Sequence, residues 1–219
     1  MHHAFPMSQA NGPFAQLDDK ALLALAPHGL TRTFRKNAVV VNEGDQTDSL
    51  YVVLSGRVKV FVTGEDGKEL VVSTIEAGDY FGEVVLDGGP RSASVMTLEV
   101  CRLFVIPHGD VEGMLTASPA FARSLIGKLT GTVRVLTAKV RDLALKDVYG
   151  RFVRFVEENA VERDGERRVP ERLTQGDVAE RIGGSREMVS RIVRDLSAGG
   201  YIAVDAKQIR VLRKLPPHW

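Results

Sequence analysis

The apolar residues between Pro119 and Leu145 are spaced by alternating steps of four and three residues. The members of this series are Ala122, Ile126, Leu129, Val133, Leu136, Val140 and Leu143. A stripe with a period of about 3.5 residues is the a/d seam of a two-stranded parallel coiled coil. The alternative is an amphipathic helix packed on its own domain. That alternative explains an apolar stripe but not so strict a seven-residue repeat. We therefore predict a dimerisation helix, residues 117–146, and a homodimer.

The chain before this helix has the pattern of short strands. Runs of β-branched and apolar residues at 38–41, 50–54, 58–62, 70–75 and 100–106 are separated by Gly44, Gly56, Gly64, Gly67 and Gly78. Turns at this spacing predict an antiparallel sandwich or barrel. We place this domain at residues 16–116, with a short helix over 16–26 at its start.

Two segments of this region carry groups that suit a ribose phosphate. Gly82 permits close approach of the backbone, Glu83 can accept from a sugar hydroxyl, and Arg91 can bind a phosphate through two donors. Ser92 adds a hydroxyl beside Arg91. A surface hairpin with an incidental ion pair fits the same residues, so by themselves they leave both interpretations open.

The segment from Leu173 to Ile192 has the spacing of two short helices around a tight turn. Thr174 and Ser185 can cap the two helices, and Gly183 can adopt the positive φ of the turn. The apolar residues that face a shared core are then Val178, Ile182, Val189, Ile192 and Leu196. This is the pattern of a helix-turn-helix, which we place in a domain over residues 147–219.

The second of these helices has a polar face that suits the major groove of DNA. Arg186 and Arg191 can each reach guanine N7 and O6, and Glu187 can accept from a cytosine amino group. Met188 is assigned to the opposite side of this helix from these polar residues. A charge cluster on a helix is usually a solvated face, but the helix-turn-helix spacing favours DNA contact. The predicted DNA-binding residues are Thr174, Ser185, Arg186, Glu187, Ser190 and Arg191.

The segments around the helix-turn-helix are assigned from their residue types. Residues 201–204 and 209–212 predict a hairpin, the wing of a winged helix-turn-helix, whereas 148–160 predicts a helix and the charged segment 163–168 a solvated loop. From Glu171 onward nine basic side chains outnumber six acidic ones. This bias has the sign expected for DNA binding but is too small to establish it.

Other classes of protein fit the sequence less well. The single cysteine, Cys101, excludes a disulfide framework and a metal site built on cysteines. Cys101 lies in an apolar strand without an assigned partner, so we expect a buried thiol rather than a nucleophile, and no enzyme. His28 and His108 lie beside prolines in predicted loops, where exposed side chains are favoured over haem ligands.

No apolar run approaches the roughly 20 residues that span a bilayer. The N-terminal segment also lacks the basic start and the apolar stretch of a signal peptide. We therefore expect a cytoplasmic protein without membrane contact.

Several segments resemble one known family. Residues 40–45 and 50–56 resemble the opening strands of cyclic-nucleotide-binding domains, and residues 81–97 resemble their phosphate-binding cassette. The string Gly184-Ser185-Arg186-Glu187, with Val189 and Arg191, resembles the recognition helix of the cAMP receptor protein type. The barrel, the phosphate cassette, the dimerisation helix and the winged helix-turn-helix follow one another in this order along the chain. With that order, nearly the whole chain resembles the cAMP receptor protein and fumarate–nitrate regulator (CRP/FNR) family of bacterial transcription factors.

The resemblance implies an α+β fold with an N-terminal antiparallel β jelly-roll, a long dimerisation helix and a C-terminal winged helix-turn-helix. It implies binding to palindromic double-stranded DNA with TGTGA-like half-sites, and contact with RNA polymerase. A nucleotide-binding regulatory subunit of a partner enzyme is an alternative of another class. That alternative explains the barrel but leaves the recognition helix without a purpose.

The effector is less defined, because the cassette departs from the family pattern. The loop between Leu86 and Arg91 is short, Val85 replaces a small residue, and Thr47 stands where Gly, Ala or Cys is common. The phosphate-binding groups are nevertheless present. We rank cAMP first, ahead of another nucleotide such as cyclic di-GMP, and ahead of a dimer that is active without ligand.

The resemblance also assigns residues of the dimerisation helix to the ligand. In cAMP-responsive members a Thr-Ser pair holds the adenine, and the corresponding residues are Leu136 and Thr137. Leu136 cannot hydrogen-bond a purine amino group, whereas Thr137 remains available from the partner chain. The predicted ligand-binding residues are Gly82, Glu83, Arg91, Ser92, Leu136 and Thr137.

Overall fold

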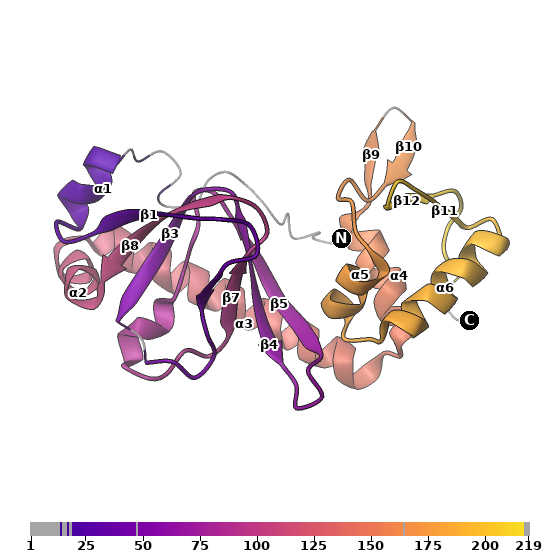
Figure 1. The fold of residues 1–219 in the computed structure, drawn as a ribbon, viewed down its shortest axis with the longest axis horizontal. Coiled ribbons are helices and arrows are strands. Elements are labelled where there is room, and N and C mark those ends of the chain that lie inside the picture. The colour runs from indigo at the N-terminus through magenta and orange to yellow at the C-terminus, as the bar shows by residue number, and fades with distance from the viewer. Residues whose placement is uncertain (1–13, 15–16, 18, 47, 164, 217–219) are drawn as a thin grey trace. The chain divides into compact units, whose positions relative to one another are not determined.

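The computed structural model describes residues 14, 17, 19–46, 48–163 and 165–216 (Figure 1). Thr47 and the outer bounds of the predicted domains, Gln16 and Trp219, lie outside the described residues. The chain divides into two compact units. Of the described residues, one unit takes in those from Phe14 to Val62 together with Val72–Arg134, and the other takes in Thr63–Val71 and those from Val135 to Pro216.

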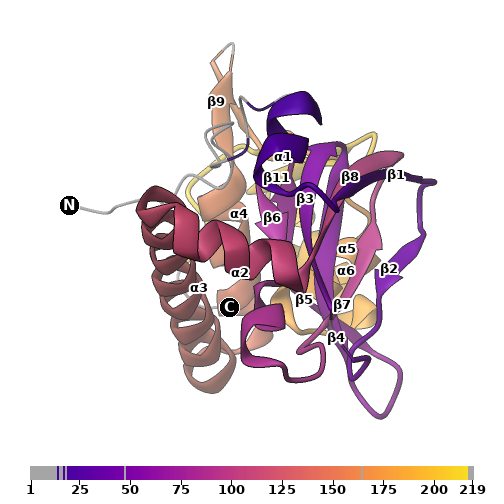
Figure 2. The same ribbon diagram turned by 90° about the vertical axis from the view of Figure 1, so that its left-hand side faces the viewer.

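Two sheets make up most of the first unit, although their residues Thr63 and Glu69–Val71 count with the second unit (Figures 1 and 2). One has the order β1 (Leu30–Phe34), β8 (Cys101–Pro107), β3 (Ser49–Ser55), β6 (Tyr80–Phe81). The other has the order β2 (Val39–Val41), β7 (Ser94–Thr97), β4 (Arg57–Thr63), β5 (Glu69–Glu76). The pairings of β3 with β6 and β8, and of β7 with β2 and β4, are antiparallel. The expected antiparallel architecture is therefore confirmed.

Strand β3 shows how alternation in the sequence produces two cores. Leu50 and Val52 belong to a cluster that also contains Tyr80, whereas Val53 belongs to a second cluster with Phe81. Successive side chains of a strand point to opposite faces of its sheet, so β3 and β6 each contribute to both cores. Burying one such side chain contributes roughly 1.5–3 kcal/mol.

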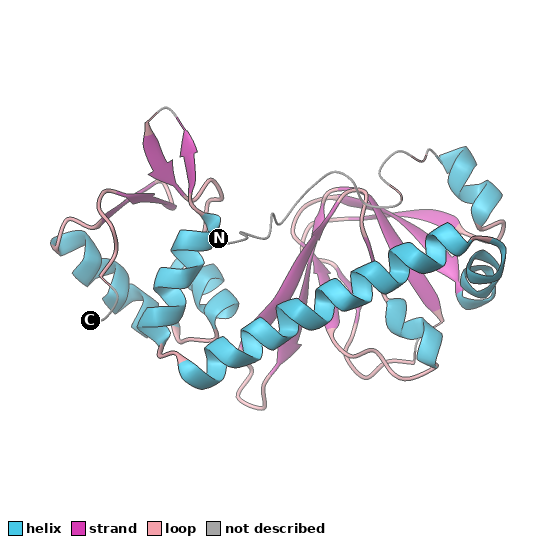
Figure 3. Cartoon of the chain, turned by 180° about the vertical axis from the view of Figure 1, so that it is seen from behind, coloured by secondary structure: helices cyan, strands magenta, loops and turns pink. Residues whose placement is uncertain are grey.

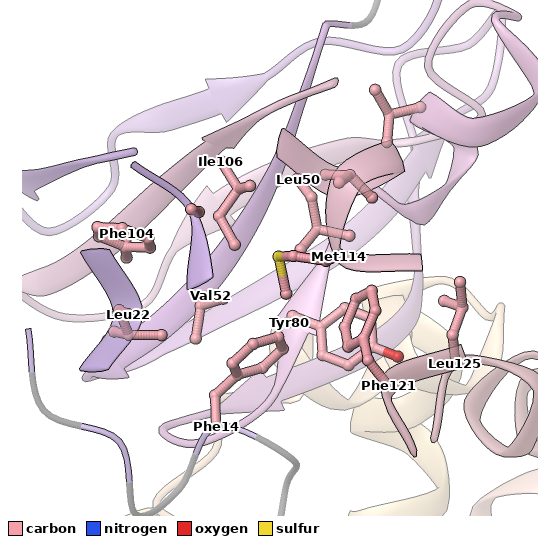
Figure 4. Close-up of a cluster of buried hydrophobic side chains, with 13 residues drawn as sticks. Phe14, Leu22, Leu50, Val52, Tyr80, Phe104, Ile106, Met114, Phe121 and Leu125 are labelled. Carbon is pink, nitrogen blue, oxygen red and sulfur yellow. The ribbon is translucent and has the colours of Figure 1, made fainter. Parts of the chain in front are cut away.

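The first cluster lies between the sheet of β3 and the helices that cover it (Figure 4). These helices are α1 (Asp19–Leu25), α2 (His108–Ala117) and the start of α3 (Pro119–Leu145). Strands β1, β6 and β7, helix α2 and the 3₁₀ helix η1 (Glu83–Asp87) were not predicted. Strand β1 was missed because its residues are mostly exposed and show no apolar alternation.

Helix α3 is uninterrupted over the predicted heptads (Figure 3). Phe121 and Leu125 are buried against the first unit. The large residues of the seam lie on another face of the helix. Their exposed fractions run from 39% for Leu136 to 65% for Val140. The chain by itself therefore leaves the heptad stripe uncovered.

The second unit contains helices α4 (Val148–Asn159), α5 (Gln175–Ile182) and α6 (Arg186–Ala198). Its sheet has the order β11 (Ile202–Asp205), β12 (Gln208–Val211), β10 (Glu166–Arg168), β9 (Val161–Arg163). Phe152, Val189, Leu196 and Ile202 are fully or almost fully buried in its core. The wing hairpin is present, and its turn places Ala206 and Lys207 at φ of 47° and 68°.

The predicted solvated loop over 163–168 is wrong. The segment forms the hairpin of β9 and β10, and β10 pairs with β12 of the wing. Arg210 on β12 also contacts Glu166, with 3.1 Å between Nη1 and Oε1. Arg163, Glu166 and Arg167 are exposed, as the sequence indicates, and Arg168 is half-buried. Main-chain pairing with a distant strand nevertheless makes the segment a strand rather than a loop.

Candidate functional site

Gly82 and Arg91 lie together at the end of β6. Gly82 has φ of 87°, and an added Cβ would lie 2.6 Å from Nη1 of Arg91 and 3.1 Å from the Ser49 carbonyl oxygen. Both the left-handed backbone and the close contacts require glycine here. Immediately after Gly82, Glu83 begins η1 and is half-buried. The structure thus brings Gly82, Glu83 and Arg91 together.

Main-chain carbonyls hold the Arg91 side chain, which is only 5% exposed. Its Nη2 donates to the Ser49 carbonyl at 2.8 Å, and its Nη1 to the Gly82 carbonyl at 3.3 Å. The guanidinium lies 5.5 Å from the centroid of the Tyr51 ring, which stacks on Phe81 at 4.9 Å. The cation is therefore fixed in position from two sides.

Burial lowers the pKa of Arg91, and the neighbouring Tyr51, Asp48 and Glu83 oppose this effect. Arginine nevertheless remains charged at neutral pH. A positive charge held in a poorly solvated position attracts an anion more strongly than one exposed to water. This arrangement can bind a phosphate.

Ser49 and Tyr51 were not identified from the sequence. They approach Arg91 because β3 pairs with β6, so that Tyr51 lies opposite Phe81. Ser92 is exposed beside Arg91. Leu136 and Thr137 are exposed on the part of α3 that belongs to the second unit. Their contact with a ligand stays a prediction.

The helix-turn-helix of α5 and α6 has the predicted turn and caps. Gly183 has φ of 65°, and the Ser185 hydroxyl accepts from the Met188 amide at 3.3 Å. Arg151 of α4 donates to the carbonyls of Ile182 at 2.7 Å and Gly183 at 3.0 Å. These bonds satisfy carbonyls at the end of α5 and hold the turn. The role of Arg151 could not be read from local spacing.

Helix α6 presents an exposed polar surface. Arg186, Glu187 and Arg191 are exposed and Ser190 is half-buried. Met188, predicted to lie on the side of α6 away from the exposed polar face, is itself 45% exposed, so that placement is wrong. The buried face of α6 is centred on Val189 and Leu196, and Met188 lies at its edge. Hydrogen bonds from its own amide and from Ser185 lower the pKa of Glu187, which keeps this side chain negative.

Thr174 has a structural role. Its hydroxyl accepts from the Asp177 amide at 3.1 Å, and Asp177 accepts from the Thr174 amide at 2.7 Å, which completes a capping box. We expect Thr174→Ala to lower the free energy of unfolding by about 1 kcal/mol, because one amide of α5 loses its partner. Denaturant unfolding followed by circular dichroism measures this, with Thr174→Ser as the control that keeps the cap. Equal stability of Thr174→Ala and wild type would contradict the assignment.

The other candidate groups are accounted for by the fold. Cys101 is buried, its thiol contacts the carbonyls of Arg57 and Glu99, and burial raises its pKa, which fits the expected structural thiol. His108 begins α2 instead of lying in a loop. The exposed His28 hydrogen-bonds Asp110 at 2.7 Å.

No group of three or more His, Cys, Asp or Glu residues in the described part of the chain could hold a metal ion. No described helix combines the length and apolar character needed to cross a membrane.

Comparisons with known proteins agree with this architecture. Residues 31–118 match the cyclic nucleotide-binding domain, and residues 150–214 match the Crp-like helix-turn-helix domain. The CRP-like cAMP-activated global transcriptional regulator of Mycobacterium tuberculosis is 27% identical over 205 residues, which cover 91% of this chain and 92% of that protein. The cAMP-activated global transcriptional regulator CRP of Salmonella typhimurium is 26% identical over 198 residues, covering 88% and 94%.

A solved structure shows the same fold. The c-di-GMP responsive global regulator CLP of Xanthomonas campestris matches with a TM-score of 0.78 and 24% identity, over 90% of this chain and 100% of that one. A cyclic-nucleotide-binding domain followed by a Crp-like helix-turn-helix defines a DNA-binding transcriptional regulator. The chain belongs to the CRP/FNR family of such regulators.

Proposed function

We propose that this regulator is a homodimer whose binding to DNA is controlled by a cyclic nucleotide in the first unit. The observation that carries the proposal is the buried guanidinium of Arg91, held beside Gly82 and Glu83. An arginine fixed by neutral carbonyls keeps its charge available for an anion. A phosphate flanked by a sugar hydroxyl fits this cation and the adjacent carboxylate.

In this proposal each polar group of the cassette has one task. Arg91, Ser92 and the amides after Gly82 bind the cyclic phosphate, and Glu83 accepts from the ribose 2′-hydroxyl. The base contacts Leu136 and Thr137 of the dimerisation helix. The two relatives in the comparison are described as cAMP-activated, which favours cAMP, and the structural neighbour is described as c-di-GMP responsive, which makes cyclic di-GMP the second candidate.

The exposed seam of α3 supports the homodimer. A contiguous apolar stripe on a soluble chain marks an interaction surface, and its heptad spacing suits a second copy of the same helix. We accordingly retain residues 117–146 as the dimerisation helix, between an effector domain at 16–116 and a DNA-binding domain at 147–219. A two-fold dimer binds a palindrome whose half-sites are about 34 Å apart, here with TGTGA-like sequence. Contact with RNA polymerase is part of the proposal.

Arg186→Ala is expected to weaken binding to a specific operator by roughly 1–3 kcal/mol and to relax the preference at one guanine. The guanidinium is exposed at the first position of α6, where it can reach a base edge. Fluorescence anisotropy with operator, base-substituted and random duplexes measures the effect. Arg172→Ala is the comparison, since a basic side chain outside α6 should affect all sequences about equally. Equal loss on specific and random duplexes for Arg186→Ala would remove Arg186 from base readout.

Calorimetry tests the effector directly. The full-length protein is titrated with cAMP, cGMP and cyclic di-GMP, and its affinity for DNA is then measured with and without each nucleotide. We expect cAMP to bind and to change the DNA affinity. If no nucleotide binds at millimolar concentration while the ligand-free protein binds operator tightly, nucleotide control is wrong and activity without ligand is favoured.

A further inference from the structure

Lys128 of α3 makes three contacts with the end of the turn between β5 and β6 and with the first residue of β6. Its Nζ lies 2.5 Å from Oδ1 of Asp79, donates to the Tyr80 carbonyl oxygen, and lies 3.9 Å from the centroid of the Tyr80 ring. The Lys128 side chain is only 18% exposed, and Tyr80 is fully buried. All of these residues belong to the first compact unit. A solvated surface pair would not combine these contacts on one segment.

The turn that Lys128 contacts is itself held firmly. The Val53 amide donates to the Asp79 carbonyl at 2.8 Å, and the Gly78 amide donates to the Val53 carbonyl at 2.8 Å. The Tyr80 amide donates to Oδ1 of Asp79 at 2.8 Å, the same oxygen that Lys128 contacts. A displacement of β6 would therefore change the position of the Lys128 partners as a group.

Strand β6 connects these contacts to the cassette. Tyr80 packs in the cluster that includes Phe121 and Leu125 of α3 (Figure 4). The next residue, Phe81, points to the other face and stacks on Tyr51, over which Arg91 lies. Gly82 follows directly. Two successive residues of one strand thus contact α3 on one side and, on the other, Tyr51, the ring that lies against the Arg91 guanidinium.

On α3, Lys128 is adjacent to the seam. It lies on the barrel face of the helix, seven residues after Phe121 and three after Leu125, and Leu129 of the heptad series follows it. A shift of α3 that preserves the Lys128 contacts therefore also moves the seam.

We propose that Lys128 is a positioning residue that couples occupation of the cassette to the arrangement of the dimerisation helix. The inference rests on the proposed nucleotide function. A ligand can switch a protein only through contacts that differ between its two states. In this proposal the contacts of Lys128 provide that difference. If ligand binding moves β6, the movement is either transmitted to α3 through these contacts or breaks them.

The test measures the coupling between nucleotide and DNA. For each variant of the full-length protein, the DNA dissociation constant is determined without nucleotide and with saturating cAMP, and the ratio of the two is the coupling factor. A parallel arm uses cyclic di-GMP. Lys128→Met keeps the apolar stem and removes the charge, and Asp79→Asn keeps the acceptor for the Tyr80 amide. We expect each to reduce the coupling factor at least fivefold, within the range typical of linked sites.

Two further variants separate coupling from stability. Lys128→Arg restores the charge and should recover most of the coupling factor. Arg123→Met removes a positive charge from an exposed position of the same helix and should leave the factor unchanged. The double variant Lys128→Met with Asp79→Asn should lose no more than either single variant, because both remove one interaction. Thermal unfolding checks that each variant is folded.

Each outcome decides the inference. An unchanged coupling factor in folded Lys128→Met, or additive losses in the double variant, would overturn the role of Lys128 while leaving nucleotide control intact. A wild-type protein that binds neither nucleotide overturns the proposed function and this inference with it. That result is distinguishable because it is obtained before any variant is made.

Discussion

Leu136→Lys is expected to convert the regulator from a dimer to a monomer at micromolar concentration. Leu136 is a d position of the heptad series on α3, and it is 39% exposed in the single chain. In the proposed coiled coil two copies of this side chain meet. Two lysines there would place like charges together in an apolar layer, which costs several kcal/mol. Size-exclusion chromatography with light scattering gives the mass directly.

The control for this prediction is Gly127→Lys. Gly127 is exposed on α3 outside the seam, and an added Cβ there meets no atom within 4 Å. The Gly127→Lys variant adds the same charge to the same helix but outside the seam, so it should leave the dimer intact. Leu136→Met, which keeps the position apolar, should also remain dimeric. A monomeric wild type, or a dimeric Leu136→Lys, would show that the seam is not the dimer contact.

Arg91→Gln is expected to weaken nucleotide affinity at least tenfold. A hydrogen bond to a charged group contributes about 1.5–3 kcal/mol, and glutamine replaces the cation with a neutral amide. The fold should persist, because Gln can still donate to one of the two carbonyls that Arg91 contacts, those of Ser49 and Gly82. Calorimetric titration with cAMP measures the affinity, and thermal unfolding measures the stability.

Arg32→Gln serves as the matched control for Arg91→Gln. Arg32 is exposed on β1 of the same unit, so losing its charge changes the overall field but not the cassette. Its affinity for cAMP should equal that of wild type. If both variants lost affinity equally, Arg91 would act through net charge and not as the phosphate anchor.

Features encoded by local spacing could be predicted from the sequence. The heptads fixed the extent of α3 to within a few residues, and Thr174, Gly183 and Ser185 marked the helix-turn-helix because caps and tight turns need particular residue types. Gly82 and Arg91 were singled out from their residue types, the family resemblance favoured a phosphate site over a surface hairpin, and the structure places the two residues together. Each of these features depends on residues close together in the chain.

Features that depend on pairing between distant segments were missed. The hairpin of β9 and β10 is a strand pair because it adds to the wing, which its charged residues do not indicate. Ser49 reaches Arg91 across 42 positions of sequence, and Lys128 reaches Asp79 across 49. Met188 was misplaced because helical periodicity locates the centre of a buried face better than its edge. Tertiary neighbours decide all of these cases.

The buried thiol of Cys101 makes the protein convenient for site-directed labelling. Thiol reagents attack the thiolate, and this cysteine, the only one in the chain, is buried with a raised pKa. A cysteine introduced at an exposed position such as Arg123 would then be the reactive one. In the proposed dimer, two spin labels or fluorophores, one on each subunit, would report the distance between the two copies of α3 while nucleotide and DNA are added, without first removing a native cysteine.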